Sequence, residues 1–448
     1  MRDVIIALVV FGSLPIILLR PWIGVLVWSW LGLMNPHLLT WGFARALPFV
    51  VIVAVTTLVA FVFSSDSKRF PWQPLTILWI AFVAWTYVTL NFALNPEEAW
   101  VEWERFWRIQ VQVAATLFIM RDRTRLNWLV WVVALSIGFY GIKGGIFTIL
   151  TGGQNMLFGP GGFIGGNNEL ALAMIMVLPL FYYLYGTVQQ KWGRRAMLAF
   201  MGLIGLSVLA SYSRGAFLGL AAMGAVLWMR MNRRFMMAAL IVMASLVFLA
   251  VMPAKWYERM GSIKDYQQDT SALGRLNAWQ FAINLANDRP VVGGGFRTFT
   301  PELFQKYAPN PLDVHDAHSA YFEVLAEQGY VGLTLYLLMG VTLLVTAQSV
   351  IRRCRGDPVN GWAAELCSMA QVSFVGYAVC AAFLGLAYFD LPYIMMSIVA
   401  ISNVLTQPHP ERGAAGNLVS TASDKRPLRA GAPMVQLGRP GVPRRPPK

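Results

Sequence analysis

Long uncharged stretches are the feature that most restricts how this chain can fold. Apolar runs separated by short polar segments recur along its 448 residues, and the longer runs reach the length of about 17 residues that a helix needs to cross a bilayer. The runs are Leu47–Phe63, Leu75–Leu90, Leu126–Leu150, Leu170–Tyr185, Ala196–Ala210, Phe235–Val251, Val331–Thr346, Val372–Ala387 and Ile394–Leu405. This pattern predicts an all-α, polytopic membrane protein.

The composition agrees with a membrane protein and argues against a nucleic-acid-binding one. Charged residues make up 13% of the chain, about half the share of a soluble domain, and the mean hydropathy is +0.54. The net charge of +14 comes from short basic clusters between apolar runs, a distribution typical of cytoplasmic loops. These clusters are Ser64–Arg69, Arg121–Arg125, Lys191–Arg195, Arg230–Arg234 and Arg352–Arg355. We therefore expect membrane lipids, and no nucleic acid, as partners.

The basic clusters also set the expected topology. With the clusters in the cytoplasm, the loops around 93–100, 151–168 and 253–325 lie on the outer side of the membrane. Residues 4–34 would span about 46 Å as one helix, which is too long for one upright crossing. Pro15 and the Arg20-Pro21 pair favour two short segments there, and whether both cross is open. We predict about twelve transmembrane helices with both chain ends inside.

Four regions follow from this topology. They are N-terminal transmembrane helices over 1–252, a long outer loop over 253–328, C-terminal transmembrane helices over 329–406, and a disordered basic cytoplasmic tail over 407–448. The tail is rich in Pro, Gly, Ala and Arg and has no apolar periodicity.

The long outer loop carries more positive charge than an outer loop needs. Its cationic residues are Lys255, Arg259, Lys264, Arg275, Arg289, Arg297 and Lys306. An anionic ligand would explain them, because arginine presents a planar fork of donors that matches phosphate oxygens.

Arg214 is a stronger candidate for an anion site. It lies in Ser213-Arg214-Gly215, a predicted tight outer turn between two apolar runs, where a charged side chain must find a partner, line a polar cavity or snorkel to the interface. The helix that starts near Ser213 would also point its N-terminal amides at an anion. Lys143, inside an apolar run, is a second candidate contact, and Glu169 is a candidate counter-charge or sugar contact.

Two of the four histidines, His315 and His318, lie where the outer loop leads into an apolar helix. A metal site, with Asp313 and Asp316 as further ligands, lacks a third histidine nearby and the His-Glu-x-x-His pattern. A structural role at the start of the helix is a second reading. The third is a general base, since a neutral imidazole can take a proton from an attacking hydroxyl. We favour a general base at His318, directly at the mouth of the helix.

These residues resemble motifs of the O-antigen ligase and polymerase superfamily of bacterial inner-membrane glycosyltransferases. The matching pieces are Ser213-Arg214-Gly215 with Leu218, Gly274-Arg275 with Trp279, Gly293-Gly294-Gly295-Phe296, and His318-Ser319 through Leu325 to Gly329. The stretches Met34–His37, Gly141–Gly153 and Asn167–Leu172 resemble the branch of exosortase-associated O-glycosylation ligases. Their order along the chain, with the long loop before the histidine, is more specific than any one motif.

The resemblance implies a GT-C-like fold of about twelve helices in the inner membrane, with the active site facing the periplasm. It implies an undecaprenyl-pyrophosphate-linked glycan as donor and lipid A–core or another glycan as acceptor, with no metal and no other cofactor. Arg214 and Arg275 correspond to pyrophosphate contacts and His318 to the catalytic residue. We expect transfer with inversion, and count His315, Arg297, Lys143 and Glu169 among the residues that contact substrate.

Three alternatives remain open from the sequence. The chain could be an O-antigen polymerase or a protein O-glycosylation ligase, which differ from an O-antigen ligase in the acceptor. It could also be a transporter of lipid-linked saccharides, which would distribute cationic residues through the depth of the membrane, whereas the candidates here cluster at the outer end.

Overall fold

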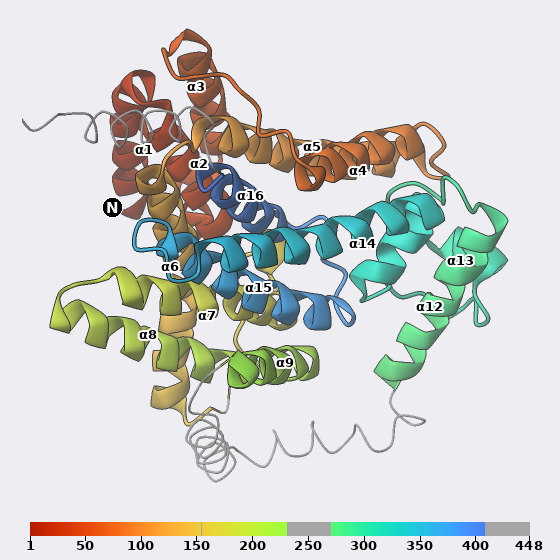
Figure 1. Cartoon of the computed structure of the whole chain (residues 1–448). Helices are drawn as coiled ribbons and strands as arrows, with labels where there is room; N and C mark the ends of the chain where they lie inside the picture. The colour runs from red at the N-terminus through yellow and green to blue at the C-terminus, as the bar shows by residue number, and fades with distance from the viewer. Residues whose placement is uncertain (154, 231–269, 408–448) are drawn as a thin grey trace, which may run out of the picture. The chain divides into compact units, whose positions relative to one another are not determined.

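A computed structural model describes residues 1–153, 155–230 and 270–407 (Figure 1). Within them the chain folds into helices and contains no strand. The N-terminal helices are α1 (Arg2–Leu19), α2 (Pro21–Met34), α3 (Phe49–Phe63), α4 (Pro74–Leu90), α5 (Pro96–Ile119), α6 (Arg123–Thr151), α7 (Asn167–Thr187), α8 (Lys191–Leu209) and α9 (Arg214–Arg230). The later helices are α12 (Thr270–Asp288), α13 (Pro301–Tyr307), α14 (Ala320–Cys354), α15 (Gly361–Ala381) and α16 (Asp390–Leu405). Short 3₁₀ turns lie at η1 (Pro36–Leu39), η2 (Phe43–Arg45) and η3 (Gly162–Ile164).

The first apolar stretch is divided into two helices, as predicted. The break falls at Arg20, and Pro21 takes the first position of α2, where its missing N–H costs nothing. Pro15 does not interrupt α1, which continues through it to Leu19.

Six helices of the described segments are long and apolar enough to cross a membrane. They are α1, α6, α7, α8, α14 and α15. The shorter apolar helices α2, α3, α4 and α16 have 10 to 17 residues each. The all-helical, multi-pass character is confirmed, while twelve crossings and a periplasmic loop stay predictions.

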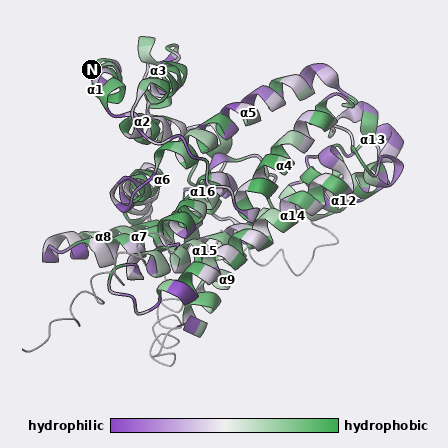
Figure 2. Cartoon of the chain, turned by 45° about the horizontal axis from the view of Figure 1, so that its top comes forward, coloured by the Kyte–Doolittle hydropathy of each residue, from purple (hydrophilic) through white to green (hydrophobic). Residues whose placement is uncertain are grey.

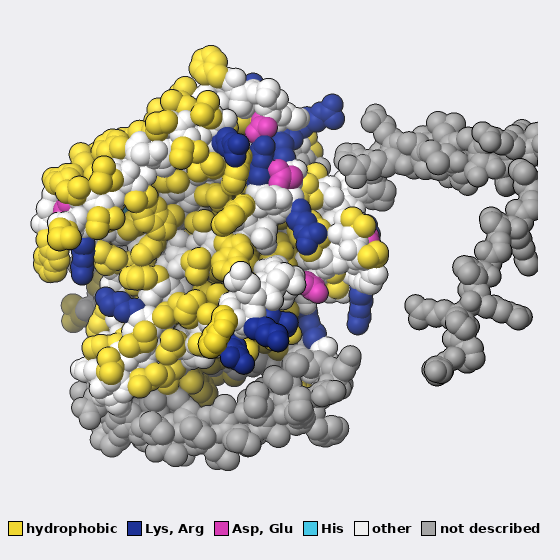
Figure 3. Space-filling view, turned by 90° about the vertical axis from the view of Figure 1, so that its left-hand side faces the viewer, with side chains coloured by type: hydrophobic (Ala, Val, Ile, Leu, Met, Phe, Trp, Pro, Cys, Tyr) yellow, Lys and Arg dark blue, Asp and Glu magenta, His cyan; other side chains and the backbone are white. Residues whose placement is uncertain are grey.

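Large apolar side chains remain on the outside of these helices. Leu8 and Leu18 of α1 and Val62 of α3 are more than half exposed. Hydrophobic side chains cover much of the face drawn in Figure 3, with Lys and Arg in separate groups. Figure 2 shows the helices mainly hydrophobic along their lengths and more hydrophilic around α13. Such a surface suits lipid rather than water.

The core of the helical assembly is built mainly by α6, α7, α15 and α16, which carry many of its buried residues. α15 packs against both α14 and α7, and α6 packs against α8. The α6–α8 contact is close because Gly145 has no side chain, and a Cβ there would lie 2.3 Å from the Leu203 carbonyl oxygen. Small residues bring membrane helices together in this way.

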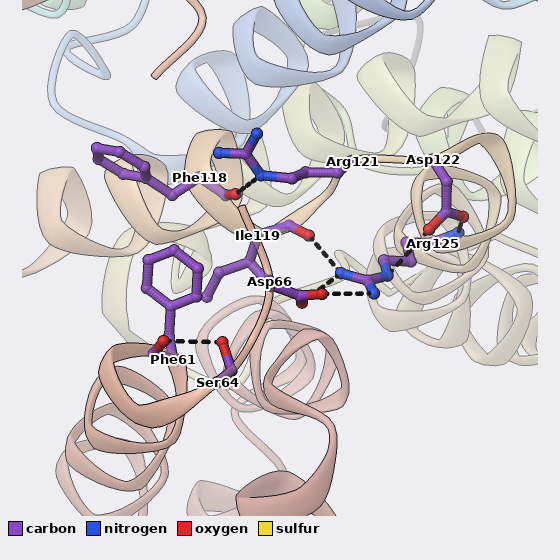
Figure 4. A network of polar contacts seen from close by, with 8 residues as sticks. All are labelled: Phe61, Ser64, Asp66, Phe118, Ile119, Arg121, Asp122 and Arg125. Atoms are coloured by element: carbon purple, nitrogen blue, oxygen red, sulfur yellow. Dashed lines mark hydrogen bonds and ion pairs between the residues drawn. The ribbon is translucent and has the colours of Figure 1, made fainter. Parts of the chain in front are cut away.

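Two of the basic clusters meet in space at the C-terminal end of α5 (Figure 4). The Arg125 guanidinium binds both carboxylate oxygens of Asp66 at 2.7 and 3.2 Å, and Arg121 donates to the carbonyl oxygens of Phe118 and Arg69. These contacts lie at one end of α5, whereas the polar cavity described below is lined by residues from the other end of the same helix. The bundle thus has a basic end and a cavity end.

The predicted outer loop contains ordered structure of its own. α12 and α13 form a small apolar cluster in which Phe281 stacks on Phe304 with ring centroids 4.4 Å apart, beside Leu285. Residues 253–269 of that loop and 408–448 of the predicted tail lie outside the described residues.

Candidate functional site

A cavity of about 370 Å³ is formed where the three predicted outer loops come together. Its walls come from the start of α5, the loop between α6 and α7, the segment from α12 to α14, and the loop between α15 and α16. The lining residues are Glu98, Glu102, Arg105, Gly162, Phe163, Gly165, Gly166, Glu169, Arg297, Phe299, Thr300, Asp316, Ala317, His318, Glu323, Glu327, Gly385, Leu386 and Tyr388. Three of the sequence candidates, His318, Glu169 and Arg297, are among them.

His318 is held at the mouth of α14 in an unusual backbone conformation. Its φ is +43°, in the left-handed region that costs a non-glycine residue about 1–3 kcal/mol. The preceding turn is fixed from α12, because the Trp279 indole donates to the Ala317 carbonyl at 2.8 Å and stacks on Phe322. A strained residue persists only where its surroundings determine it, and here the surroundings hold the imidazole in the cavity wall.

The surroundings of His318 favour its neutral form. Burial lowers the pKa of the imidazole below its ordinary value of 6.5, and the positive charge of Arg275 lowers it further. Asp316 and Glu169 act in the opposite direction. The ring is therefore neutral near pH 7 and can accept a proton. The carboxylates of Asp316 and Glu169 would then stabilise the resulting imidazolium.

His315 has a different environment. It is exposed, its Nε2 lies 2.7 Å from the Asp313 carboxylate, and it is not part of the cavity lining. Its ring packs against Gly274, where a Cβ would lie 2.5 Å from the imidazole. His315 thus contacts the segment that carries Arg275. Within the described residues no group of three or more His, Cys, Asp or Glu side chains could hold a metal ion.

The Gly-rich segment before α13 is fastened to the first turns of α14. The amides of Gly294 and Gly295 donate to the carbonyls of Ala326 and Glu327 at 2.8 and 2.9 Å. Gly329 has a φ of +68°, and a Cβ there would lie 2.5 Å from the Val291 carbonyl oxygen, so only glycine fits. This contact fixes the backbone that leads to Arg297.

Arg297 lines the cavity with its charge already balanced. Its guanidinium pairs with Glu102 of α5 at 2.9 Å. Its φ is +60°, and its amide donates to the Glu327 carboxylate at 2.8 Å. Two of the four non-glycine residues with positive φ in the described segments, His318 and Arg297, therefore stand in this one cavity.

Arg214 and Arg275 lie near the cavity but not in its described lining. Arg214 is the first residue of α9, and the turn before it is joined to α7 by a 2.8 Å hydrogen bond from the Asn167 amide to the Ser211 carbonyl. Glu169, on the same turn of α7, lines the cavity. Arg275 lies on α12, half-buried, and acts on the charge of His318. Lys143 is exposed on α6 and is not among the lining residues.

Comparison with protein families finds a match over the segment that carries most of the candidate site residues. The O-antigen ligase family matches residues 198–337. This segment is similar to that family. It contains Arg214, Arg275, Arg297 and both candidate histidines. Residues 1–189 match a family of unknown function (DUF5935). No curated protein matches the chain. The resemblance to the O-antigen ligase superfamily is therefore confirmed.

The cavity has acidic residues that the sequence analysis did not single out. Glu98 and Glu102 come from α5, outside the O-antigen ligase segment, and Glu323 and Glu327 come from α14, inside it. Each pair is spaced four residues apart, which puts both carboxylates on one helix face. This four-residue spacing of acidic residues is the sequence feature from which the two pairs could have been predicted.

Proposed function

We propose that this protein is a glycosyltransferase of the O-antigen ligase type. It moves a glycan from undecaprenyl pyrophosphate to a sugar hydroxyl on lipid A–core at the periplasmic face of the inner membrane. The observation that carries the proposal is His318, a residue of the O-antigen ligase segment whose neutral imidazole is held in a strained turn in the wall of a polar cavity.

In the proposed reaction His318 acts as general base. The imidazole accepts the proton of the acceptor hydroxyl, whose oxygen forms a bond to the anomeric carbon of the donor sugar. The bond from that carbon to the phosphate oxygen breaks, and the pyrophosphate leaves with the electron pair. Attack from the face opposite the leaving group inverts the anomeric configuration. Asp316 and Glu169 stabilise the imidazolium, which is the direction in which they act on His318.

The leaving group requires positive charge of its own. In the proposal Arg214 and Arg275 bind the pyrophosphate and stabilise the charge that develops as the bond breaks. The segment just before Arg214 is tied to α7, and Arg275 influences His318, so both belong to the surroundings of the cavity.

A direct test uses purified protein and a fluorescent undecaprenyl-pyrophosphate-linked glycan, with lipid A–core as acceptor. The proposal expects a new glycolipid and released undecaprenyl pyrophosphate in equal amounts. A deletion strain should correspondingly lose the polymer from its surface lipid. Movement of the donor across vesicle membranes without transfer would instead show a transporter.

The electrostatics of His318 give a prediction that does not depend on turnover. Asp316→Asn should lower the imidazole pKa, because a carboxylate that favours the charged form is lost, whereas Arg275→Gln should raise it. NMR of the protein labelled at histidine measures both shifts, and the signal is assigned by its loss in His318→Ala. Shifts of the same sign in the two variants would contradict the arrangement.

We also predict that transfer does not depend on a divalent metal. The sequence offers no third histidine close to His315 and His318, and the proposed chemistry uses a base and two arginines. Activity should persist in excess chelator at its original rate. If activity were lost in chelator and restored by zinc or magnesium, His315 and His318 would instead be ligands of a metal site.

A further inference from the structure

The described walls of the cavity are acidic. Six carboxyl groups line it, from Glu98, Glu102, Glu169, Asp316, Glu323 and Glu327, against two guanidinium groups, from Arg105 and Arg297. Burial disfavours the charged forms of Glu323 and Glu327, and both arginines share Glu102, so the negative charge of the cavity comes from Glu98, Glu169 and Asp316. The two arginines are already engaged. Arg297 pairs with Glu102 at 2.9 Å, and Arg105 lies 3.7 Å from Glu102 and 3.8 Å above the ring of Phe163. The field inside the cavity therefore favours neutral or positive groups.

Glu327 and Tyr388 form a polar pair in the cavity wall. Glu327 is 4% exposed and lines the cavity. One oxygen of its carboxyl group accepts the Arg297 amide, and the Tyr388 hydroxyl is a second hydrogen-bond partner of the same group. A hydroxyl of a bound ligand would extend this network of hydrogen bonds.

Aromatic rings complete the wall. Phe163, Phe299 and Tyr388 line the cavity together with the carboxylates. Rings that cover the apolar face of a ligand, combined with a few polar groups that accept its hydrogen bonds, suit a polyhydroxylated ring. The volume of about 370 Å³ lies within the range of about 300–1,000 Å³ found for small-molecule sites.

We propose that this cavity holds the acceptor sugar and selects one whose reacting ring carries hydroxyl or amino groups but no phosphate or carboxylate. The inference rests on the proposed function, because it assigns the cavity to the acceptor through His318, the group that must reach the acceptor hydroxyl. The donor pyrophosphate is left to Arg214 and Arg275, which are not among the lining residues.

The selection comes from electrostatic repulsion between an anionic sugar ring and the carboxylates of the cavity. An anionic ring in this cavity would face several carboxylates at short range, and such juxtaposition costs several kcal/mol in a binding site. A neutral ring exchanges water for carboxylate acceptors, and an amino sugar gains charge-assisted hydrogen bonds.

The experiment compares three oligosaccharides of equal length on the full-length protein in nanodiscs. The probes are chitotriose, which is neutral, its de-N-acetylated form, which is cationic, and trigalacturonate, which is anionic. Binding is measured by saturation-transfer NMR at low salt. Chitotriose and its cationic form should bind, and trigalacturonate should bind at least about tenfold more weakly. Equal or tighter binding of trigalacturonate would overturn the proposal.

Matched variants separate charge from shape. The double variant Glu98→Gln, Asp316→Asn removes two cavity carboxylates. It should reduce the ratio of the affinity for chitotriose to the affinity for trigalacturonate at least about threefold. Glu104→Gln is the control, since Glu104 lies on the same helix, pairs with Arg108 and does not line the cavity. Higher salt should narrow the difference in wild type as well. A preference that neither the double variant nor salt changes would show exclusion by shape and refute the electrostatic selection.

Transfer assays keep this inference apart from the proposed function. If lipid-anchored acceptors with a neutral or an anionic terminal sugar are used equally well, the selection is wrong and the glycosyltransferase stands. If no acceptor receives glycan while the binding preference persists, the glycosyltransferase fails and the preference remains a property of the cavity.

Discussion

Replacing His318 with alanine is expected to lower the rate of the chemical step by about 10²–10⁴-fold, the usual contribution of general base catalysis. Donor binding should change little, because the proposal assigns the pyrophosphate to Arg214 and Arg275. Single-turnover transfer with saturating donor, at matched protein levels in the membrane, measures the effect. The same assay gives its pH dependence, where the wild-type rate should fall as pH drops through the imidazole pKa. That fall should come below pH 6.5, since burial lowers the pKa of His318.

His315→Ala is the matched control. His315 is a histidine from the same segment, exposed and outside the cavity lining, with Asp313 as its partner. The His315→Ala variant should keep most of the wild-type transfer rate, and that rate should fall at low pH over the same range as in wild type. A wild-type rate in His318→Ala, or a complete loss in His315→Ala alone, would contradict the choice of base.

His318→Asn tests the backbone separately from the imidazole. Asparagine tolerates the left-handed conformation better than alanine does, so it should preserve the turn at φ +43° while it removes the base. If loss of activity comes from chemistry, both variants should be equally slow. If His318→Asn were active, the residue would serve the turn rather than the reaction.

Much of the helical framework could be predicted from local sequence. The Arg20-Pro21 break, the turn before Arg214 and the start of α14 after His318 all fall where prolines or polar residues interrupt apolar runs. These signals are local, so one sequence is enough to find them. The internal helices of the outer loop, α12 and α13, were not predicted, because their apolar residues produce no long run and pack against each other and against the first turns of α14.

The site was predictable only in part, for a different reason. His318 and Glu169 could be chosen by residue type and position, and they do meet in one cavity. The ion pair between Arg297 and Glu102 joins residues 195 positions apart, and no local pattern reports it. From the sequence, Arg297 was therefore predicted to offer its charge to an anion, whereas the structure shows that charge paired with Glu102 of α5. The left-handed conformations of His318 and Arg297 also depend on contacts with distant helices.

Arg214→Ala and Arg275→Ala are each expected to reduce glycan transfer to background while the protein remains in the membrane. Each removes charge-assisted hydrogen bonds to the proposed pyrophosphate. Arg214→Lys should also fail substantially, because an ammonium is a point charge and does not reproduce the guanidinium fork. The measurement is transfer from a labelled donor in membranes. Arg289→Ala is the control, since Arg289 is another arginine of the same segment and donates to the Phe92 carbonyl.

The two arginine variants should differ in how they respond to pH. Arg275 lowers the pKa of His318, so its loss raises that pKa and leaves more of the base protonated near neutrality. Raising the pH should therefore recover part of the activity lost in Arg275→Ala relative to wild type. Arg214→Ala leaves in place Arg275, the arginine charge that lowers the pKa of His318, so it should show less recovery. Equal recovery in both variants would mean that the two arginines do not differ in their effect on His318. Full activity of both variants would contradict the proposed pyrophosphate site.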